Sequence, residues 1–166
     1  MPKASAYLDS CVWIAQYKPS ELTKDQRSGL VSLMESVNGG SVVIVASSMI
    51  FVEALTVSQD DIERAFDGRK GQIIAADEEI AKQSRILQNK CFKEAKKVLS
   101  PIDSIHLVTA AMAGCQQFVT LDRRHKANQL SPIADKVMLE RLLGVKIVDP
   151  SELDDQKRLD LDLEEG

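Results

Sequence analysis

The chain has 166 residues, enough for one compact domain with a core and too few for two ordinary domains. With 44% hydrophobic and 28% charged residues its composition is typical of a globular protein, and no stretch approaches the roughly 18 consecutive apolar residues of a membrane span. The three cysteines show neither Cys-x-x-Cys nor Cys/His spacing, which disfavours a disulfide framework and a structural zinc site.

The formal net charge of −4 is unevenly distributed along the chain. Residues 149–166 hold eight Asp/Glu and two Lys/Arg, a net of −6, which leaves 19 basic and 17 acidic residues, a net of +2, for residues 1–148. The acidic total therefore does not exclude a nucleic-acid partner for the body of the chain. We divide the chain into a domain over residues 1–149 and an acidic C-terminal tail over residues 150–166. We expect the tail to be a flexible, solvated end, although its spaced leucines leave a docking role open.

The first element in chain order is a short apolar segment with strand character, residues 4–9. The residues before it lack the basic region, apolar stretch and cleavage site of a secretory signal peptide. We therefore expect a soluble, cytoplasmic protein with reduced thiols and no membrane partner.

Strand-like and helical segments alternate along the rest of the chain. The predicted strands, residues 4–9, 41–46, 117–120 and 145–148, are short and apolar, as expected when helices cover both faces of a parallel sheet. The alternation predicts an α/β domain. Helices are predicted over residues 11–16, 24–37, 49–57 with a break near Ser58 before any continuation, 78–98 and 102–113.

Glycine and proline mark several boundaries. Ser100 and Pro101 open a helix, with serine as the cap and proline in the first turn. Residues 68–71 (GRKG) predict an exposed loop. Glycines close helices before the second, third and fourth strands, as C-terminal caps do: Gly40, Gly114 and Gly144.

Four carboxylates stand at informative positions. Asp9 ends the first predicted strand and Asp122 follows the third, so both are expected at the edge where open parallel sheets bind ligands. Glu53 lies within the helix predicted after the second strand, and Asp103 lies in the first turn of the helix that leads to the third. Each aspartate taken alone could have a structural role instead of a ligand-binding one, because helix caps and first turns favour Asp.

Glu53 is harder to explain structurally, because residues 49–57 are apolar almost throughout and an unpaired buried carboxylate is costly. An exposed stripe through Glu53 remains the other reading. If the four carboxylates meet, each close pair repels by roughly 4 kcal/mol at about 4 Å and an effective dielectric of about 20. A hard cation with oxygen ligands, Mg²⁺ or Mn²⁺, would offset that repulsion, whereas zinc is disfavoured. Metal-assisted hydrolysis of a phosphodiester is the chemistry that such a site predicts.

At these acids the sequence resembles the PIN-domain family, including the VapC-type toxins, from about Ala6 to Val148. Four segments carry the resemblance. Residues 7–10 (YLDS) resemble the family's opening strand and Asp-Ser/Thr turn, and residues 47–53 (SSMIFVE) its helix with a central Glu. Residues 103–111 (DSIHLVTAA) resemble its third-acid helix, and residues 119–122 (VTLD) its final strand and fourth acid.

The resemblance implies a PIN-like three-layer α/β/α domain with a short, mainly parallel sheet of four or five strands flanked by helices. It implies endonucleolytic cleavage of RNA with Mg²⁺ or Mn²⁺ as cofactor. The catalytic residues and metal ligands would be the same four acids: Asp9, Glu53, Asp103 and Asp122.

The resemblance further implies the toxin component of a type II toxin–antitoxin system. An antitoxin protein would insert a peptide into the acidic cleft, and the chain would form a homodimer. Two positions depart from the family pattern. Cys11 stands where many members have Asn, and His125 stands where a further acidic residue often follows the fourth acid.

Three residues near the acids have two readings each. The Ser10 hydroxyl either binds a metal-bound water or a phosphate, or caps the helix that follows Asp9. Thr120 is either a hydrogen-bonding residue behind the fourth acid or an ordinary β-branched strand residue. For His106, one turn beyond the third acid among apolar neighbours, we expect a packed, hydrogen-bonded side chain rather than a ligand.

A basic run follows the fourth acid directly. Such runs are usually solvated surface, but this one adjoins a predicted acidic site. There Arg123, Arg124 and Lys126 would be placed to bind the phosphates of an RNA backbone. Because aromatic residues make up only 4% of the chain, base stacking is not expected to dominate recognition.

Two other functions stay open beside a toxin nuclease. One is a housekeeping RNA-processing nuclease of the same fold without an antitoxin, and a toxic phenotype on expression would separate the two. The other is a catalytically weak module that keeps the fold and binds RNA or protein. Failure to bind a divalent ion would favour the second.

Overall fold

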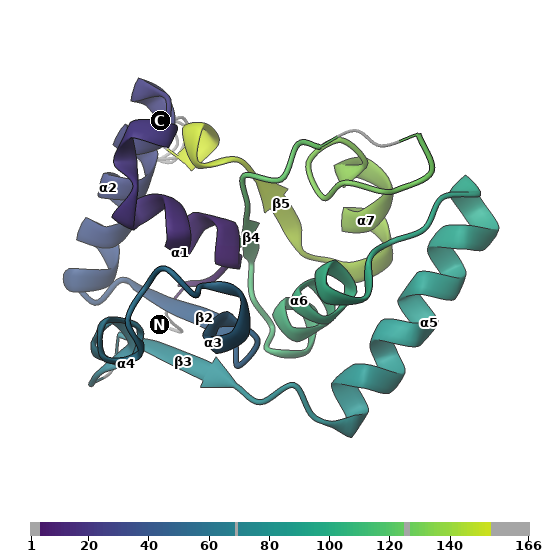
Figure 1. The fold of residues 1–166 in the computed structure, drawn as a ribbon, viewed down its shortest axis with the longest axis horizontal. Helices are drawn as coiled ribbons and strands as arrows, with labels where there is room; N and C mark the ends of the chain where they lie inside the picture. Colours follow the sequence, from purple (N-terminus) through teal and green to yellow (C-terminus); the bar gives the residue numbers. More distant parts are fainter. Residues whose placement is uncertain (1–3, 69, 125–126, 154–166) are drawn as a thin grey trace, which may run out of the picture.

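The computed structural model describes residues 4–68, 70–124 and 127–153, and within these ranges five strands form one parallel sheet. The strands lie side by side in the order β3-β2-β1-β4-β5 (Figure 1). Their bounds are β1 (Ala4–Leu8), β2 (Val42–Ser47), β3 (Gly71–Ile74), β4 (Gln117–Val119) and β5 (Lys146–Val148).

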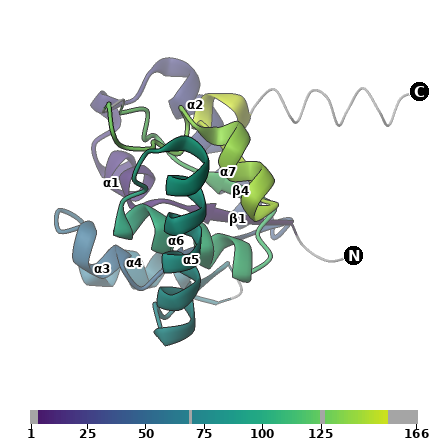
Figure 2. The same cartoon turned by 90° about the vertical axis from the view of Figure 1, so that its right-hand side faces the viewer.

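Helices cover both faces of the sheet. Figure 1 shows α1, α2 and α4 on one side and α5, α6 and α7 on the other, and Figure 2 shows the second group in front of the sheet. The helices are α1 (Ser10–Tyr17), α2 (Lys24–Asn38), α3 (Ile50–Glu53), α4 (Gln59–Phe66), α5 (Glu78–Ala95), α6 (Pro101–Met112) and α7 (Lys136–Leu143), with 3₁₀ turns η1 (Pro19–Glu21) and η2 (Pro150–Glu152).

The strand sequences divide the interior into two cores, because successive strand residues point to opposite faces. Ala6 and Leu8 of β1 pack with the residues of α1 to α4. Tyr7, between them, packs with the residues of α5, α6 and α7. A sheet covered on both faces explains why the predicted strands are apolar without polar alternation. The expected three-layer α/β/α arrangement is therefore the one observed.

The strand order places one crevice at the centre of the sheet. From β1 the chain moves outward through β2 to β3, and then returns to β4 on the other side of β1 before reaching β5. Such a reversal is where open parallel sheets bind ligands, beyond the carboxyl ends of the strands. The residues after β1 and β4 meet at this point, since Asp9 N donates to the Val119 carbonyl at 3.0 Å.

One strand was missing from the sequence prediction. Residues 68–71 were predicted as a loop, but β3 begins at Gly71 and pairs with β2. A Cβ atom at Gly71 would lie 2.6 Å from Phe66 and 2.7 Å from Ile44, so only glycine allows this close approach. A four-residue strand that begins with glycine carries too little hydrophobic pattern to be recognised in sequence.

The helix predicted over residues 49–57 was too long. In the structure α3 ends at Glu53, and the chain leaves helical geometry at Ala54 (φ −84°, ψ 49°). The next helix, α4, has its own cap, because the Ser58 side chain accepts a hydrogen bond from the Asp61 N–H. Glu53 is thus the last residue of a single helical turn rather than a residue inside an apolar helix.

Two further helix boundaries differ from the prediction. The helix predicted to reach Val98 ends at Ala95, because Lys96 adopts a left-handed conformation with φ 57°. Helix α7 had no predicted range, although its terminator was recognised. Gly144 ends it with φ 70°, the conformation that favours glycine.

The packed domain reaches beyond residue 149. The turn η2 and Leu153 lie against α2, and Leu153 is buried in the same core as α1 and α2. The first four residues assigned to the tail therefore belong to the domain. Residues 154–166, the rest of the predicted acidic tail, lie outside the described residues. Across the described ranges, none of the helices has the length and apolar character needed to cross a membrane.

Candidate active site

Asp9 lies between β1 and α1, at the carboxyl edge of the sheet. Its backbone is extended and its side chain caps α1 by accepting a hydrogen bond from the Ser10 N–H at 2.8 Å. The other carboxylate oxygen, Oδ2, accepts from Thr120 Oγ1 at 2.7 Å and from the Cys11 thiol at 3.2 Å. Asp9 is therefore both a helix cap and a buried carboxylate held in one orientation from three sides.

Glu53 reaches Asp9 from the end of α3. Its Oε2 atom accepts a hydrogen bond from Ser10 Oγ at 3.0 Å and is paired with Nε2 of His106. The same Nε2 atom lies 4.0 Å from Asp9 Oδ1. Residues that follow β1, a residue of the helix after β2 and a residue of α6 thus meet at one point.

Asp103 and Asp122 complete the group on the other side. Ser100 caps α6 and donates its hydroxyl to Asp103 Oδ2 at 2.6 Å, as expected for the serine and proline that open this helix. Asp122 follows β4, and its Oδ1 accepts from the backbone N–H of Arg124 at 3.0 Å and from the guanidinium Nε at 3.1 Å. Glu53, Asp103 and Asp122 line one pocket of about 230 Å³.

Electrostatics shows that the acids act on one another. Burial raises the pKa of Asp103, and the negative charges of Asp9 and Asp122 raise it further, against a hydrogen bond from Ser100 that lowers it. A carboxyl whose charged form is disfavoured by neighbouring carboxylates lies in a field that a cation would relieve.

All four predicted acids are at this edge, and their oxygen atoms are the ligands that Mg²⁺ and Mn²⁺ prefer. The donor chemistry therefore fits a hard divalent cation. As the side chains lie, however, no three Asp, Glu, His or Cys residues in the described ranges are grouped closely enough to hold an ion. Each carboxylate is instead engaged by a protein donor. The donor to Asp122 is the Arg124 guanidinium, whose side chain is 80% exposed.

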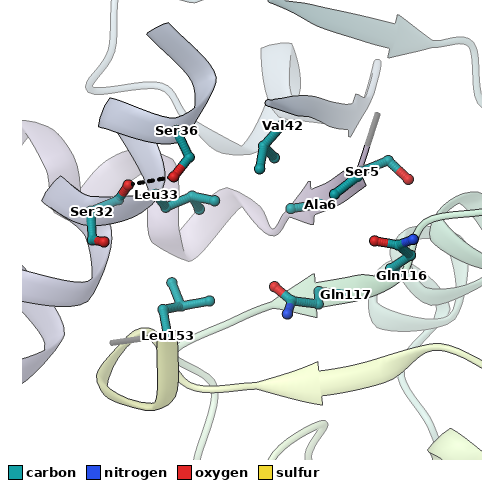
Figure 3. Close-up of a pocket in the computed structure, with 10 residues that line it drawn as sticks. Ser5, Ala6, Ser32, Leu33, Ser36, Val42, Gln116, Gln117 and Leu153 are labelled. Atoms are coloured by element: carbon teal, nitrogen blue, oxygen red, sulfur yellow. Dashed lines mark hydrogen bonds between the residues drawn. The ribbon is translucent and has the colours of Figure 1, made fainter. Parts of the chain in front are cut away.

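The other end of the sheet offers a contrast. A second pocket of about 230 Å³ lies where β1, β2 and β4 begin, under α2 (Figure 3). Figure 3 shows serine and glutamine side chains with aliphatic neighbours, and the Ser36 hydroxyl donates to the Ser32 carbonyl. None of the described residues that line it is charged, in contrast to the pocket at the carboxyl edge.

The structure excludes the capping role of Ser10 and gives Thr120 a hydrogen-bonding role. The cap of α1 is Asp9, and the Ser10 hydroxyl instead bridges from Asp9 Oδ1, at 3.4 Å, to Glu53. Thr120 is fully buried and its hydroxyl donates to Asp9 while accepting from the Asp122 N–H at 3.1 Å. Both residues therefore orient acids of the site.

Cys11, which departs from the family pattern, is part of the same network. Its sulfur accepts a hydrogen bond from the Leu121 N–H at 3.3 Å while the thiol donates to Asp9. Burial and the charge of Asp9 raise the pKa of Cys11, which keeps the thiol protonated. A neutral donor thus stands at this position, so the substitution leaves Asp9 with a hydrogen-bonding neighbour.

His106 is packed and hydrogen-bonded, as predicted. Its ring is buried, with Nδ1 2.6 Å from Tyr7 Oη and Nε2 on Glu53. The sequence did not reveal that its partner is one of the four acids, and Tyr7 was not singled out at all. A polar residue at an inward position of β1 was the only available signal.

The basic run divides between two acids. Arg124 pairs with Asp122 in the site, whereas the Arg123 guanidinium lies 2.8 Å from Asp149 and is not part of the pocket lining. His125 and Lys126 lie outside the described residues, as does Arg69. Arg124 is the one described member of the run that adjoins the pocket.

Asp149 has a structural role that can be tested. It is fully buried after β5, caps η2, and accepts hydrogen bonds from Gln26 of α2 and from Ser151. Replacing Asp149 by Asn should lower the free energy of unfolding at pH 7 by about 1–3 kcal/mol, because charge-assisted hydrogen bonds are lost.

The pH dependence of this loss of stability follows from the direction in which the pKa of Asp149 is shifted. Burial alone would raise the pKa of Asp149, but hydrogen bonds from Ser151 and Arg123 bring the pKa below its ordinary value. Such a group stabilises the fold above its unfolded pKa, about 3.9, and loses that contribution as the pH falls through the folded pKa. Urea unfolding of both proteins should therefore give a difference that is constant above about pH 5 and shrinks below about pH 4. A difference that grew on acidification would contradict this assignment.

Comparison with known proteins gives similarity at the level of structure. No protein-family model matches the chain, and no curated protein is similar to it in sequence. Crystal structures of VapBC2 from Rickettsia felis bound to a promoter DNA fragment and of FitAcB from Neisseria gonorrhoeae superpose on it with TM-scores of 0.54 and 0.52. The chain has a PIN-like α/β/α fold.

The extent of the match supports the fold as a whole. Each alignment covers 87% of this chain, and 98% and 97% of the respective matched chains, at 14% and 16% sequence identity. The PIN-like fold predicted from the four acidic motifs is thus confirmed as a fold. Identity at this level carries no information about individual residues, so their roles follow from the geometry above.

Proposed function

We propose that this protein is a divalent-metal-dependent endoribonuclease. The observation that carries the proposal is the convergence of four acids from separate elements on the crevice between β1 and β4. Three of them line one pocket, and Asp9 is joined to Glu53 by the Ser10 hydroxyl. Their order and element types match the PIN-domain motifs that the sequence resembles.

The residues present fit Mg²⁺ or Mn²⁺ through Asp9, Glu53, Asp103 and Asp122. When bound, such an ion supplies an activated water and stabilises the charge that develops on the phosphodiester. The protein's part is orientation. Thr120 and the Ser10 N–H hold Asp9, and Ser100 holds Asp103, so two of the acids need no ordering when the ion and substrate bind.

Arg124 links the acids to the substrate. Its guanidinium neutralises Asp122 in the absence of a cation, and its side chain is largely exposed. Because most of this side chain is exposed beside the pocket, the guanidinium would also be placed to meet an RNA phosphate, for which arginine geometry is well suited.

The biological role that we propose is the toxin component of a type II toxin–antitoxin system. The sequence motifs resemble VapC-type toxins, and VapBC2 is among the structures that share the fold. This role implies an antitoxin that blocks the acidic cleft, a homodimer and a cytoplasmic location. A catalytically weak binding module is the second candidate, and the engagement of every carboxylate by a protein donor favours it.

The test is cleavage of a mixed RNA pool by the purified protein with Mg²⁺ or Mn²⁺, beside an EDTA control. We expect cutting with either metal and none with EDTA. Metal-independent cutting would contradict the mechanism. Absence of cutting together with retained RNA binding would favour the binding module over the nuclease.

A further inference from the structure

We propose that Tyr7 and His106 are positioning residues that hold Glu53 in the site through a chain of hydrogen bonds anchored on the Ser47 backbone. The inference deepens the proposed function and rests on it for its catalytic consequence. The hydrogen-bond chain itself is tested separately.

The direction of the chain is determined at its buried end. A backbone N–H can only donate, so Tyr7 Oη accepts from Ser47 N at 2.9 Å. The single hydroxyl proton of Tyr7 is then directed at Nδ1 of His106, 2.6 Å away. With Nδ1 as acceptor, the imidazole carries its proton on Nε2 and donates it to Glu53.

Donation to Glu53 is also independent of the charge on His106. The neutral ring with Nδ1 as acceptor carries a hydrogen on Nε2. The cationic ring does so too, although its Nδ1–H would then donate to Tyr7 Oη. Glu53 therefore faces an N–H donor in either state.

The two positioning residues are buried more deeply than Glu53. Tyr7 is fully buried and stacks on Phe118, with ring centroids 5.2 Å apart and an interplanar angle of 10°. His106 is held edge-on against Tyr7, with a centroid separation of 5.8 Å. Tyr7 belongs to the core shared with α5 and α7. His106 lies on α6, whose neighbouring residues pack into the same core.

Glu53, by contrast, has a partly exposed side chain and ends a segment of a single helical turn. Helix α3 has four residues and unwinds at Ala54, and its neighbours Val52 and Leu55 are 63% and 83% exposed. Its carboxylate is held instead by Ser10 and His106. Ile50 and Ala54 anchor the turn in the core, but without the histidine N–H only the Ser10 hydroxyl would be left to orient the Glu53 carboxylate. Hydrogen-bonding partners of metal ligands typically change metal affinity by about 10–100-fold when removed.

The first measurement is Mn²⁺ binding by titration calorimetry, without RNA, for the wild type, Tyr7→Phe and His106→Gln. Tyr17→Phe is the matched control, because Tyr17 is the only other tyrosine, is about half exposed and lies at the far end of α1. We expect Tyr7→Phe to weaken Mn²⁺ binding about 10-fold and Tyr17→Phe to leave it unchanged. Equal affinity for wild type and Tyr7→Phe would overturn the proposal.

A double variant separates positioning from general destabilisation. If Tyr7 acts through His106, adding Tyr7→Phe to His106→Gln should cost little further Mn²⁺ affinity, because the chain is already broken. Full additivity of the two effects would mean that Tyr7 acts only by supporting the fold, and would overturn the proposal. Melting curves of all variants identify any that have not folded.

A second measurement follows the imidazole directly by long-range ¹H–¹⁵N NMR, with His106→Gln assigning the signals. The wild type should show a protonated Nε2, and Glu53→Gln should shift that signal more than Tyr17→Phe does. An unprotonated Nε2 in the wild type would overturn the chain. If the protein binds no Mn²⁺ and cuts no RNA while the NMR result holds, the proposed function fails and the hydrogen-bond chain stands.

Discussion

Replacing Asp103 by Asn should lower metal-dependent RNA cleavage by about 10²–10³-fold with little loss of stability. A metal-held charge interaction contributes several kcal/mol to the transition state, and each ~1.4 kcal/mol is a factor of ten in rate. Asp103 lines the pocket, and its pKa is raised by burial and further by the nearby charges of Asp9 and Asp122. Asparagine keeps the size of the side chain and an oxygen that can accept from Ser100.

The matched control is Asp25→Asn. Asp25 occupies the first turn of α2, as Asp103 occupies that of α6, but it is exposed and outside the pocket. Cleavage rates with Mn²⁺ and melting temperatures should be measured together for the wild type and both variants. Cleavage by Asp103→Asn at the rate of Asp25→Asn would remove Asp103 from the site or reveal a contaminating nuclease.

Replacing Gly29 by Ala should destabilise the fold by about 1–3 kcal/mol, although alanine favours helices over glycine by about 1 kcal/mol. The reason is contact between α2 and η2. A Cβ atom at Gly29 would lie 1.8 Å from the Pro150 carbonyl oxygen and 2.9 Å from its carbon. Because these atoms are backbone, α2 and η2 would have to separate, which would also strain the hydrogen bond from Gln26 to Asp149.

Urea unfolding monitored by circular dichroism is the measurement. Val31→Ala on the same helix is the control, since Val31 is 53% exposed and alanine is a good helix former there. The Gly29→Ala midpoint should fall while the Val31→Ala midpoint stays within the range of ordinary surface substitutions, about ±0.5 kcal/mol. A Gly29→Ala protein more stable than the wild type would show that helix propensity outweighs this close approach.

The variants at Gly29 and Asp149 also show how a loss of stability can be told apart from a loss of metal binding. Both residues join α2 to the C-terminal turn, and neither lines the pocket of the acids. Their variants should lose stability while the folded fraction keeps its metal affinity. Tyr7→Phe should instead change Mn²⁺ affinity more than it changes stability. Comparing the two groups separates the site from its scaffold.

The sequence by itself determined the fold class and the positions of the acids. Short apolar strands alternating with helices require a covered parallel sheet, and the caps at Ser100 and Gly144 were readable because capping is a local interaction. Asp9 and Asp122 could be placed at one edge because the carboxyl ends of parallel strands share it. These inferences need only neighbouring residues and one topological rule.

Only the tertiary structure decided how the acids are held. Glu53 ends a single helical turn, and the apolar pattern that predicted a longer helix belongs partly to exposed residues such as Leu55. The pairing of Glu53 with His106 and that of Arg123 with Asp149 join residues far apart in the chain. Such partners are chosen by how the layers pack, which no local pattern encodes, and the close contact of Gly29 with Pro150 has the same origin.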